Sequence, residues 1–453
     1  MTEARLPSER DAAPKTAVFL FVVALLLLFY VSPMALSFVG VKYDLPEGPA
    51  WQKLHPATSV AILAFCAALA LRQRPLHRLV ALAAAFPGAT YFIAMWLLLT
   101  LHGMINQHAQ ITALVEPYAL SLVALFLYDD LSPGRRRALR KFLHVTIIVN
   151  ALIGVAEYVF GWRLFPYVIS GVEIDGDFRS TALFGHPLLN ACTTGTYILC
   201  LFLGGDRELR PAWRVLALLT TLLAMFAFGG RTAIVASSLV IGLVSLKNLA
   251  GVLLGARFDI RWVVLAMLLT PALIGGAAAA ILGGVLNRFV DRFVDDNGSG
   301  EARVIVLQMF DKFDLTAMLV GPPPDLVGSY LNSFGIGIGI ENNWLALLFQ
   351  YGAWMTLFFC CGLFALFWEF WRRGGKGITL IFVYFLIVIS SAIGLATKTL
   401  IFAHFSVLLL FLFERPPVAV VAASPQRAPN DYGHDGLDAF SEADAWPGER
   451  SIA

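Results

Sequence analysis

Three ionisable residues are prominent because each falls at the edge of a long apolar run. Arg179 lies in segment 177–187, just before such a run, and Arg231 follows Gly230 between two runs with almost no connecting loop. Glu341 stands immediately before a third run. Guanidinium groups suit phosphate oxygens, and a carboxylate can accept a proton from a sugar hydroxyl. These residue types indicate chemistry on a phosphate-linked, hydroxyl-bearing substrate at a membrane surface.

Each candidate also has a purely structural interpretation. Arg231 can extend its guanidinium from the apolar region to water. Glu341 can be stabilised by the dipole of the helix that follows it. His186 can act as a base, but in the dipeptide His186-Pro187 it can equally form a turn at the entrance to an apolar run.

The segment 285–342 separates two groups of apolar runs and holds further candidates. Arg288 and Arg292 lie on a predicted helix with phenylalanine and valine along one face, a pattern typical of a helix lying in the membrane interface. Pairing of these arginines with neighbouring aspartates is the structural alternative. A second helix is predicted after 297–300, with Arg303 near its start. Because acidic residues outnumber basic ones here, only particular arginines can hold an anion.

The elements that must position these residues are membrane-spanning helices. The 453 residues are 58% hydrophobic and only 14% charged, with a mean hydropathy of +0.74. Since about 20 apolar residues cross a ~30 Å hydrocarbon layer, we expect an all-α polytopic membrane protein with about twelve transmembrane helices, within a range of roughly 11–13. The predicted spans are 16–39, 57–71, 79–101, 110–128, 142–161, 183–203, 215–229, 232–246, 262–284, 343–370, 378–396 and 399–413.

The distribution of lysine and arginine predicts the orientation of these spans. With the N-terminus inside, most of the 33 basic residues fall in cytoplasmic segments, as the positive-inside rule requires. Residues 1–15 then form a cytoplasmic N-terminus and 16–413 the transmembrane domain. Within it, 285–342 forms a large periplasmic loop with short amphipathic helices. Residues 414–453, rich in proline, alanine and acidic residues, are predicted to be a disordered cytoplasmic tail.

Composition argues against several classes of function. A net charge of +2 gives no general field for nucleic acid. The five cysteines lie in apolar runs without the spacing of a metal or redox site, and no motif requires a metal or cofactor. Glu116, Glu157 and His404 fall inside predicted spans, where ionisable residues are functional candidates by default. Three scattered residues make a weak case for proton-coupled transport.

Three motifs occur in a recognisable order: Arg179-Ser-Thr-Ala-Leu-Phe-Gly-His-Pro187, Gly230-Arg231-Thr-Ala, and Glu341-Asn342-Asn-Trp-Leu followed by Gly352. Over roughly residues 140–370 this order resembles the O-antigen ligase and Wzy-type polysaccharide polymerase superfamily of bacterial inner-membrane proteins. The VpsF-like exopolysaccharide branch is the nearest in pattern. Glu341 stands where the ligases have a histidine, which favours polymerase-like transfer over transfer to lipid A.

The resemblance implies a glycosyltransferase that joins undecaprenyl-diphosphate-linked oligosaccharide repeat units at the periplasmic face of the inner membrane. It implies catalytic roles for Glu341, which activates the acceptor hydroxyl, and for Arg231 and Arg179, which bind the diphosphate. Its implied partners are the lipid-linked oligosaccharide, membrane lipids and other exopolysaccharide assembly and export proteins. The predicted substrate-binding residues are Arg303, Arg288, Arg292, His186 and Asn342.

Other functions are compatible with the same sequence. A ligase would transfer the glycan to a different acceptor. A transporter or flippase would move a polysaccharide precursor without forming a bond and needs a polar cavity across the spans. A non-catalytic export subunit would tolerate loss of Glu341 and Arg231.

Overall fold

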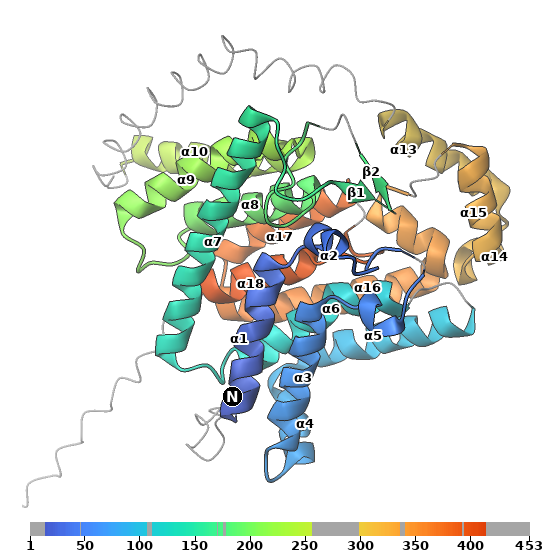
Figure 1. Cartoon of the computed structure of the whole chain (residues 1–453), viewed down its shortest axis with the longest axis horizontal. Coiled ribbons are helices and arrows are strands. Elements are labelled where there is room, and N and C mark those ends of the chain that lie inside the picture. Colours follow the sequence, from blue (N-terminus) through green and yellow to red (C-terminus); the bar gives the residue numbers. More distant parts are fainter. Residues whose placement is uncertain are drawn as a thin grey trace, which may run out of the picture. The chain divides into compact units, whose positions relative to one another are not determined.

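The computed structural model describes residues 14–45, 47–106, 111–169, 171–174, 178–255, 299–335, 340–391 and 394–413 (Figure 1). The chain divides into two compact units, Met1–Glu414 and Arg415–Ala453. The second unit, which corresponds to the predicted tail, lies outside the described residues, as do most of the predicted N-terminal segment and the predicted span 262–284.

The described part is helical apart from one short antiparallel hairpin, formed by β1 (Val168–Ile169) and β2 (Val172–Glu173). The α-helices are α1 (Lys15–Tyr30), α2 (Pro33–Phe38), α3 (Pro56–Ala70), α4 (Pro75–Ala85), α5 (Pro87–Ile105), α6 (Ile111–Leu127), α7 (Pro133–Phe160), α8 (Pro187–Phe202), α9 (Pro211–Phe228), α10 (Arg231–Leu253), α13 (Ser299–Gln308), α14 (Leu315–Val320), α15 (Pro324–Ser333), α16 (Asn343–Gly374), α17 (Gly377–Ser390) and α18 (Ile401–Leu412). Two short 3-10 helices are η2 (Ala50–Lys53) and η3 (Met309–Lys312).

Proline defines many of the helix starts. It occupies the beginning of helices such as α3, α5, α8 and α9, where its missing N–H is not needed and its fixed φ suits the first turn. Within the described residues, five helices are long and apolar enough to cross a membrane: α5, α7, α9, α10 and α16. The number becomes six if α3 and α4 are counted as one bent span. By the length and composition of its helices, the chain is a multi-pass membrane protein.

The centre of the bundle is built from shorter helices. Every residue of α18 is buried, and α8 is buried along nearly its whole length. Both pack against neighbours in the bundle, and α18 also packs against α6 (Figure 1). The helices around them expose large apolar side chains, among them Leu97, Leu223, Leu239 and Phe364. This pattern suits helices whose outer faces meet lipid, because apolar patches of this extent are rare on soluble monomers.

Three of the predicted spans are wrong as continuous helices. The segment 343–370 is broken within α16 by the non-helical backbone of Gly352. The other two break just before a proline. The segment 16–39 breaks after Tyr30, where the Ser32 hydroxyl accepts the backbone N–H of Ala35 and starts α2. The segment 79–101 breaks at Phe86, which separates α4 from α5. In both cases the next helix begins with proline, a boundary signal that the continuous apolar run obscures.

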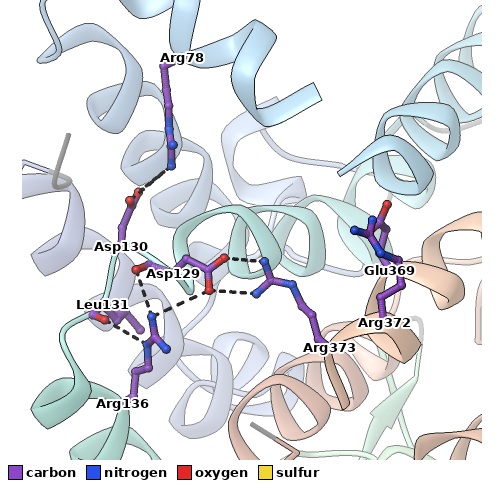
Figure 2. A network of polar contacts seen from close by, with 8 residues as sticks. All are labelled: Arg78, Asp129, Asp130, Leu131, Arg136, Glu369, Arg372 and Arg373. Atoms are coloured by element: carbon purple, nitrogen blue, oxygen red, sulfur yellow. Dashed lines mark hydrogen bonds and ion pairs between the residues drawn. The ribbon is translucent and has the colours of Figure 1, made fainter. Parts of the chain in front are cut away.

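The bundle has two chemically different ends. At one, which we call the basic end, Asp129 and Asp130 connect the α6–α7 turn to arginines from other elements (Figure 2). At the other, which we call the site end, lie the starts of α3, α8, α10 and α16 and the ends of α9 and α17. The helices α6, α8 and α16 each run from the site end to the basic end.

Candidate functional site

Glu157 of α7 holds the loop that carries Arg179 in place through hydrogen bonds. One of its carboxylate oxygens accepts hydrogen bonds from the Ser180 hydroxyl (2.5 Å) and from the backbone N–H groups of Thr181 (2.9 Å) and Ala182 (2.8 Å). The other oxygen accepts the backbone N–H of Leu164 at 2.8 Å. Glu157 is 3% exposed, so this carboxylate fixes backbone deep in the protein. These contacts are structural, although the position of Glu157 inside a predicted span made it a functional candidate.

Two buried asparagines extend this support toward α8. The Asn150 amide donates to Asn190 (2.8 Å) and its oxygen accepts the backbone N–H of Leu183 (3.0 Å). Asn190 in turn donates to the carbonyls of Thr181 (2.6 Å) and His186 (3.0 Å). The residues from Ser180 to His186, just before α8, are therefore held by side chains from α7 and α8.

His186 caps α8. Its Nδ1 accepts the backbone N–H of Leu188 at 3.2 Å, and its Nε2 lies 3.3 Å from the Tyr167 hydroxyl. An acceptor at Nδ1 leaves the proton of the neutral ring on Nε2. In this arrangement His186 is suited to orient the turn and to donate a hydrogen bond, and it is poorly suited to act as a base.

Arg231 is the first residue of α10, and close packing places it beside α8. A Cβ atom added to Gly230 would lie 2.3 Å from the Cβ of Ala191, so the start of α10 contacts α8 directly. The backbone N–H of Ser180 donates to the carbonyl of Ala227 at 3.0 Å, which joins the Arg179 loop to the end of α9. The structure thus brings Arg179, His186 and Arg231 to one region.

The start of α10 carries positive charge. A cation at a helix N-terminus faces the positive end of the helix dipole. Gly230 provides no side-chain cap, and the first turn of α10 contains no acidic residue. The Arg231 side chain is half-buried. Uncapped N–H groups and a guanidinium at one point form an arrangement that attracts an anion such as phosphate.

Glu341 and Asn342 stand at the start of α16. The Asn342 side chain caps this helix by accepting the backbone N–H groups of Trp344 (3.0 Å) and Leu345 (3.1 Å). Its neighbour Asn343 is fully buried. The Asn343 oxygen accepts the N–H groups of Leu395 (2.7 Å) and Ala396 (2.8 Å), which ties the start of α16 to the segment after α17.

Helix α17 contacts both the region of Arg179 and Arg231 and the start of α16, where Glu341 lies. The Trp344 indole donates to the Ser390 hydroxyl at 2.7 Å, near the end of α17. Six residues earlier along the same helix, the Tyr384 hydroxyl donates to the carbonyl of Cys192 at 3.2 Å, next to the Ala191 contact of Gly230. Glu341 is therefore attached to the same end of the bundle as Arg231.

Three predicted site residues lie wholly or partly outside the described part of the structure. Arg288 and Arg292 lie outside the described residues. Arg303 is on α13, the helix predicted after 297–300, but its side chain is outside the described part. Among the described residues, no three histidine, cysteine, aspartate or glutamate side chains gather as a metal site would require.

Glu116 and His404, the other candidates inside predicted spans, also have structural contacts. The Glu116 carboxylate accepts the backbone N–H of His55 (2.9 Å) and the Thr58 hydroxyl (2.6 Å) at the start of α3. The His404 ring donates to the carbonyl of Leu400 at 2.9 Å and packs between Phe29 and Phe184. The sequence marked these residues as unusual but gave no sign of their backbone partners.

Lys398 lies between α17 and α18 at the site end. Its ammonium group donates to the carbonyl of Tyr43 and lies 3.2 Å from the centroid of the Tyr43 ring. Burial lowers the pKa of Lys398 from 10.5 to about 8, while the carboxylates of Asp44 and Glu116 act in the opposite direction.

We expect this lowered pKa to be visible in the reactivity of Lys398 and in the pH dependence of protein stability. Acetylation of Lys398 in the folded protein, followed by peptide mass spectrometry, should reach half of its maximal rate near pH 8. Between pH 8 and about 10 the unfolded chain keeps a proton that the folded protein has released. Unfolding then takes up a proton, so the contribution of this group to stability rises with pH in that window. A midpoint equal to that of the urea-unfolded chain would contradict the burial of Lys398.

Comparison with protein-family models, with curated proteins and with solved structures finds no match for this chain. The candidate function therefore depends on the residues and on their arrangement.

Proposed function

We propose that the chain is a polysaccharide polymerase-like glycosyltransferase that acts on oligosaccharides linked to undecaprenyl diphosphate. The observation that carries this proposal is Arg231 at the uncapped start of α10, beside the loop of Arg179. A diphosphate leaving group would be stabilised there by guanidinium groups and helix N–H groups together. The motif order that resembles the O-antigen ligase and Wzy-type superfamily supports the same assignment.

In the proposed reaction, the acceptor hydroxyl oxygen attacks the anomeric carbon of the donor glycan. The bond between that carbon and the diphosphate oxygen breaks, and undecaprenyl diphosphate leaves with the bonding electrons. Glu341 accepts the hydroxyl proton as the new glycosidic bond forms. Arg231 and Arg179 balance the charge that grows on the diphosphate. Within this proposal, about twelve spans place both termini in the cytoplasm and the site end at the periplasmic face of a bacterial inner membrane.

Reconstitution tests the proposal. The purified protein in liposomes receives a lipid-linked oligosaccharide, and the products are sized on a gel. A ladder of multimers that disappears in Glu341→Gln and persists in Glu173→Gln supports the polymerase, because Glu173 is an exposed carboxylate of the β1–β2 hairpin. A single shifted band that needs a separate acceptor indicates a ligase. Absence of any covalent product from folded protein overturns the enzyme and favours a transporter or an export subunit.

Replacement of Arg231 by lysine separates recognition from simple charge. Lysine keeps the positive charge but loses the planar fork that binds two phosphate oxygens at once. We expect kcat to fall at least tenfold, which corresponds to about 1.4 kcal/mol of transition-state stabilisation. Arg210→Lys is the matched control, because Arg210 is an exposed arginine at the start of α9, at the basic end. Unchanged turnover in Arg231→Lys would mean that the Arg231 guanidinium extends to water and does not bind the diphosphate.

A further inference from the structure

The helix α4 departs from the direction of the bundle. It follows α3 after a break of four residues, and the two helix axes are bent by 116°. If α3 runs across the membrane, a bend not far from a right angle directs α4 along the membrane surface. Leu82 is the only residue of α4 that is buried, so most of this helix is not covered by the rest of the described protein.

The side chains of α4 separate into three directions. Leu82 faces the protein, and Arg78 on the same side pairs with Asp130 at 3.3 Å. Leu76 is 77% exposed and Val80 is 68% exposed, and their spacing of four residues places them on one apolar face. His77 is also exposed and projects from a different face. This division is typical of a helix that lies in the membrane interface.

The surroundings of α4 are rich in arginine. Asp130 pairs with Arg72 of the α3–α4 connection. Asp130 also pairs with Arg78, and Asp129 pairs with Arg373 of α16 and contacts Arg136 of α7 at 3.9 Å (Figure 2). Four arginines thus share two aspartates, which leaves a positive excess at the basic end. Exposed Arg74, the residue before Pro75, and exposed Arg135 at the start of α7 add to it.

We propose that the basic end is a binding surface for anionic phospholipids, with α4 embedded along the headgroup region. Leu76, Leu79 and Val80 insert among the acyl chains, and Arg74 contacts lipid phosphates. The ion pairs to Asp130 fix the orientation of α4, so that its apolar face is presented to the bilayer before any lipid binds. This surface is separate from the site end and does not depend on the proposed transferase activity.

Depth measurement tests the orientation of α4. Nitroxide labels are placed singly at positions 76, 77, 80 and 84 in the full chain, after replacement of the exposed or partly exposed Cys66, Cys360 and Cys361 by alanine. The protein is then studied in nanodiscs. We expect labels at 76 and 80 to be shielded from a nickel chelate and accessible to oxygen at similar depths, and the label at 77 to be accessible to nickel. A steady increase in depth from 76 to 84 would show an upright helix and overturn the proposal. Nickel access at 76 and 80 would overturn it as well.

Lipid titration tests the choice of headgroup. Binding of phosphatidylglycerol and phosphatidylcholine to the detergent-purified protein is measured by native mass spectrometry. We expect tighter binding of phosphatidylglycerol, and about five-fold weaker binding in Arg74→Gln, the change that one basic residue near an anionic surface produces. Lys42→Gln, an exposed lysine at the site end, is the control and should bind as the unmodified protein does. Equal binding of the two lipids, or an Arg74→Gln protein that binds normally, would overturn the headgroup assignment.

Discussion

Replacement of Glu157 by leucine is expected to unfold the region around the Arg179 loop. Leucine fills a similar volume but accepts no hydrogen bond, so the Ser180 hydroxyl and three backbone N–H groups lose their acceptor. Each buried donor left without a partner costs about 1–3 kcal/mol, and a loss of at least about 4 kcal/mol follows for the set.

The measurement is the thermal unfolding temperature in detergent, followed by the fluorescence of a thiol dye at the buried cysteines. The unfolding temperature of Glu157→Gln should lie between those of the unmodified protein and of Glu157→Leu. Glutamine keeps one side-chain oxygen that accepts hydrogen bonds, while its amide nitrogen faces a donor. Glu173→Leu, at an exposed position, should stay close to the unmodified protein. If Glu157→Leu unfolds at the unmodified temperature, this carboxylate does not hold the loop.

The second large effect is expected for Gly352→Ala. Gly352 has φ 79° and ψ 168° in the middle of α16, a conformation that is essentially restricted to glycine. An added Cβ would lie 2.4 Å from the backbone nitrogen of Gly321 and 2.5 Å from the backbone carbonyl carbon of Val320. Because both atoms are backbone, no side-chain rotation relieves the contact. Strain and overpacking together are expected to cost about 4 kcal/mol.

Gly242→Ala is the matched control for this substitution. Gly242 lies within α10, and a Cβ there would meet nothing within 4 Å. Alanine should therefore stabilise that helix by up to about 1 kcal/mol. A Gly352→Ala protein that folds with normal stability would mean that α16 runs straight through this position and that α14 does not press against it.

The sequence predicted the helical class and most of the apolar helices, because spans of hydrophobic residues carry a strong signal. It placed Arg231 and Glu341 at the starts of helices, where the structure also has them, whereas Arg179 lies in the loop between α7 and α8. The break at Phe86 was missed because the apolar run continues through it, although Pro87 marked the boundary. A run of apolar residues records burial or lipid contact, and it does not record where the backbone turns.

The supporting contacts of the candidate site were harder to predict for a different reason. Glu157, Asn190 and Asn343 all bind backbone groups, which every residue has and which leave no mark on the sequence. The Asn343 oxygen, for example, meets N–H groups 52 and 53 residues away. Only the side chain that accepts can be seen in a sequence, and an isolated polar residue in a span has several possible explanations.

The buried glutamates have a consequence for the biosynthesis of the protein. Glu116 completes the start of α3, which is translated about 60 residues earlier, and Glu369 accepts the backbone N–H of Gly88 at the start of α5, 281 residues before it. These early helices enter the membrane with exposed N–H groups that their own neighbours do not satisfy. The first half of the chain is thus completed only when α16 arrives, and ribosome-bound chains that end before Glu369 should hold α5 loosely.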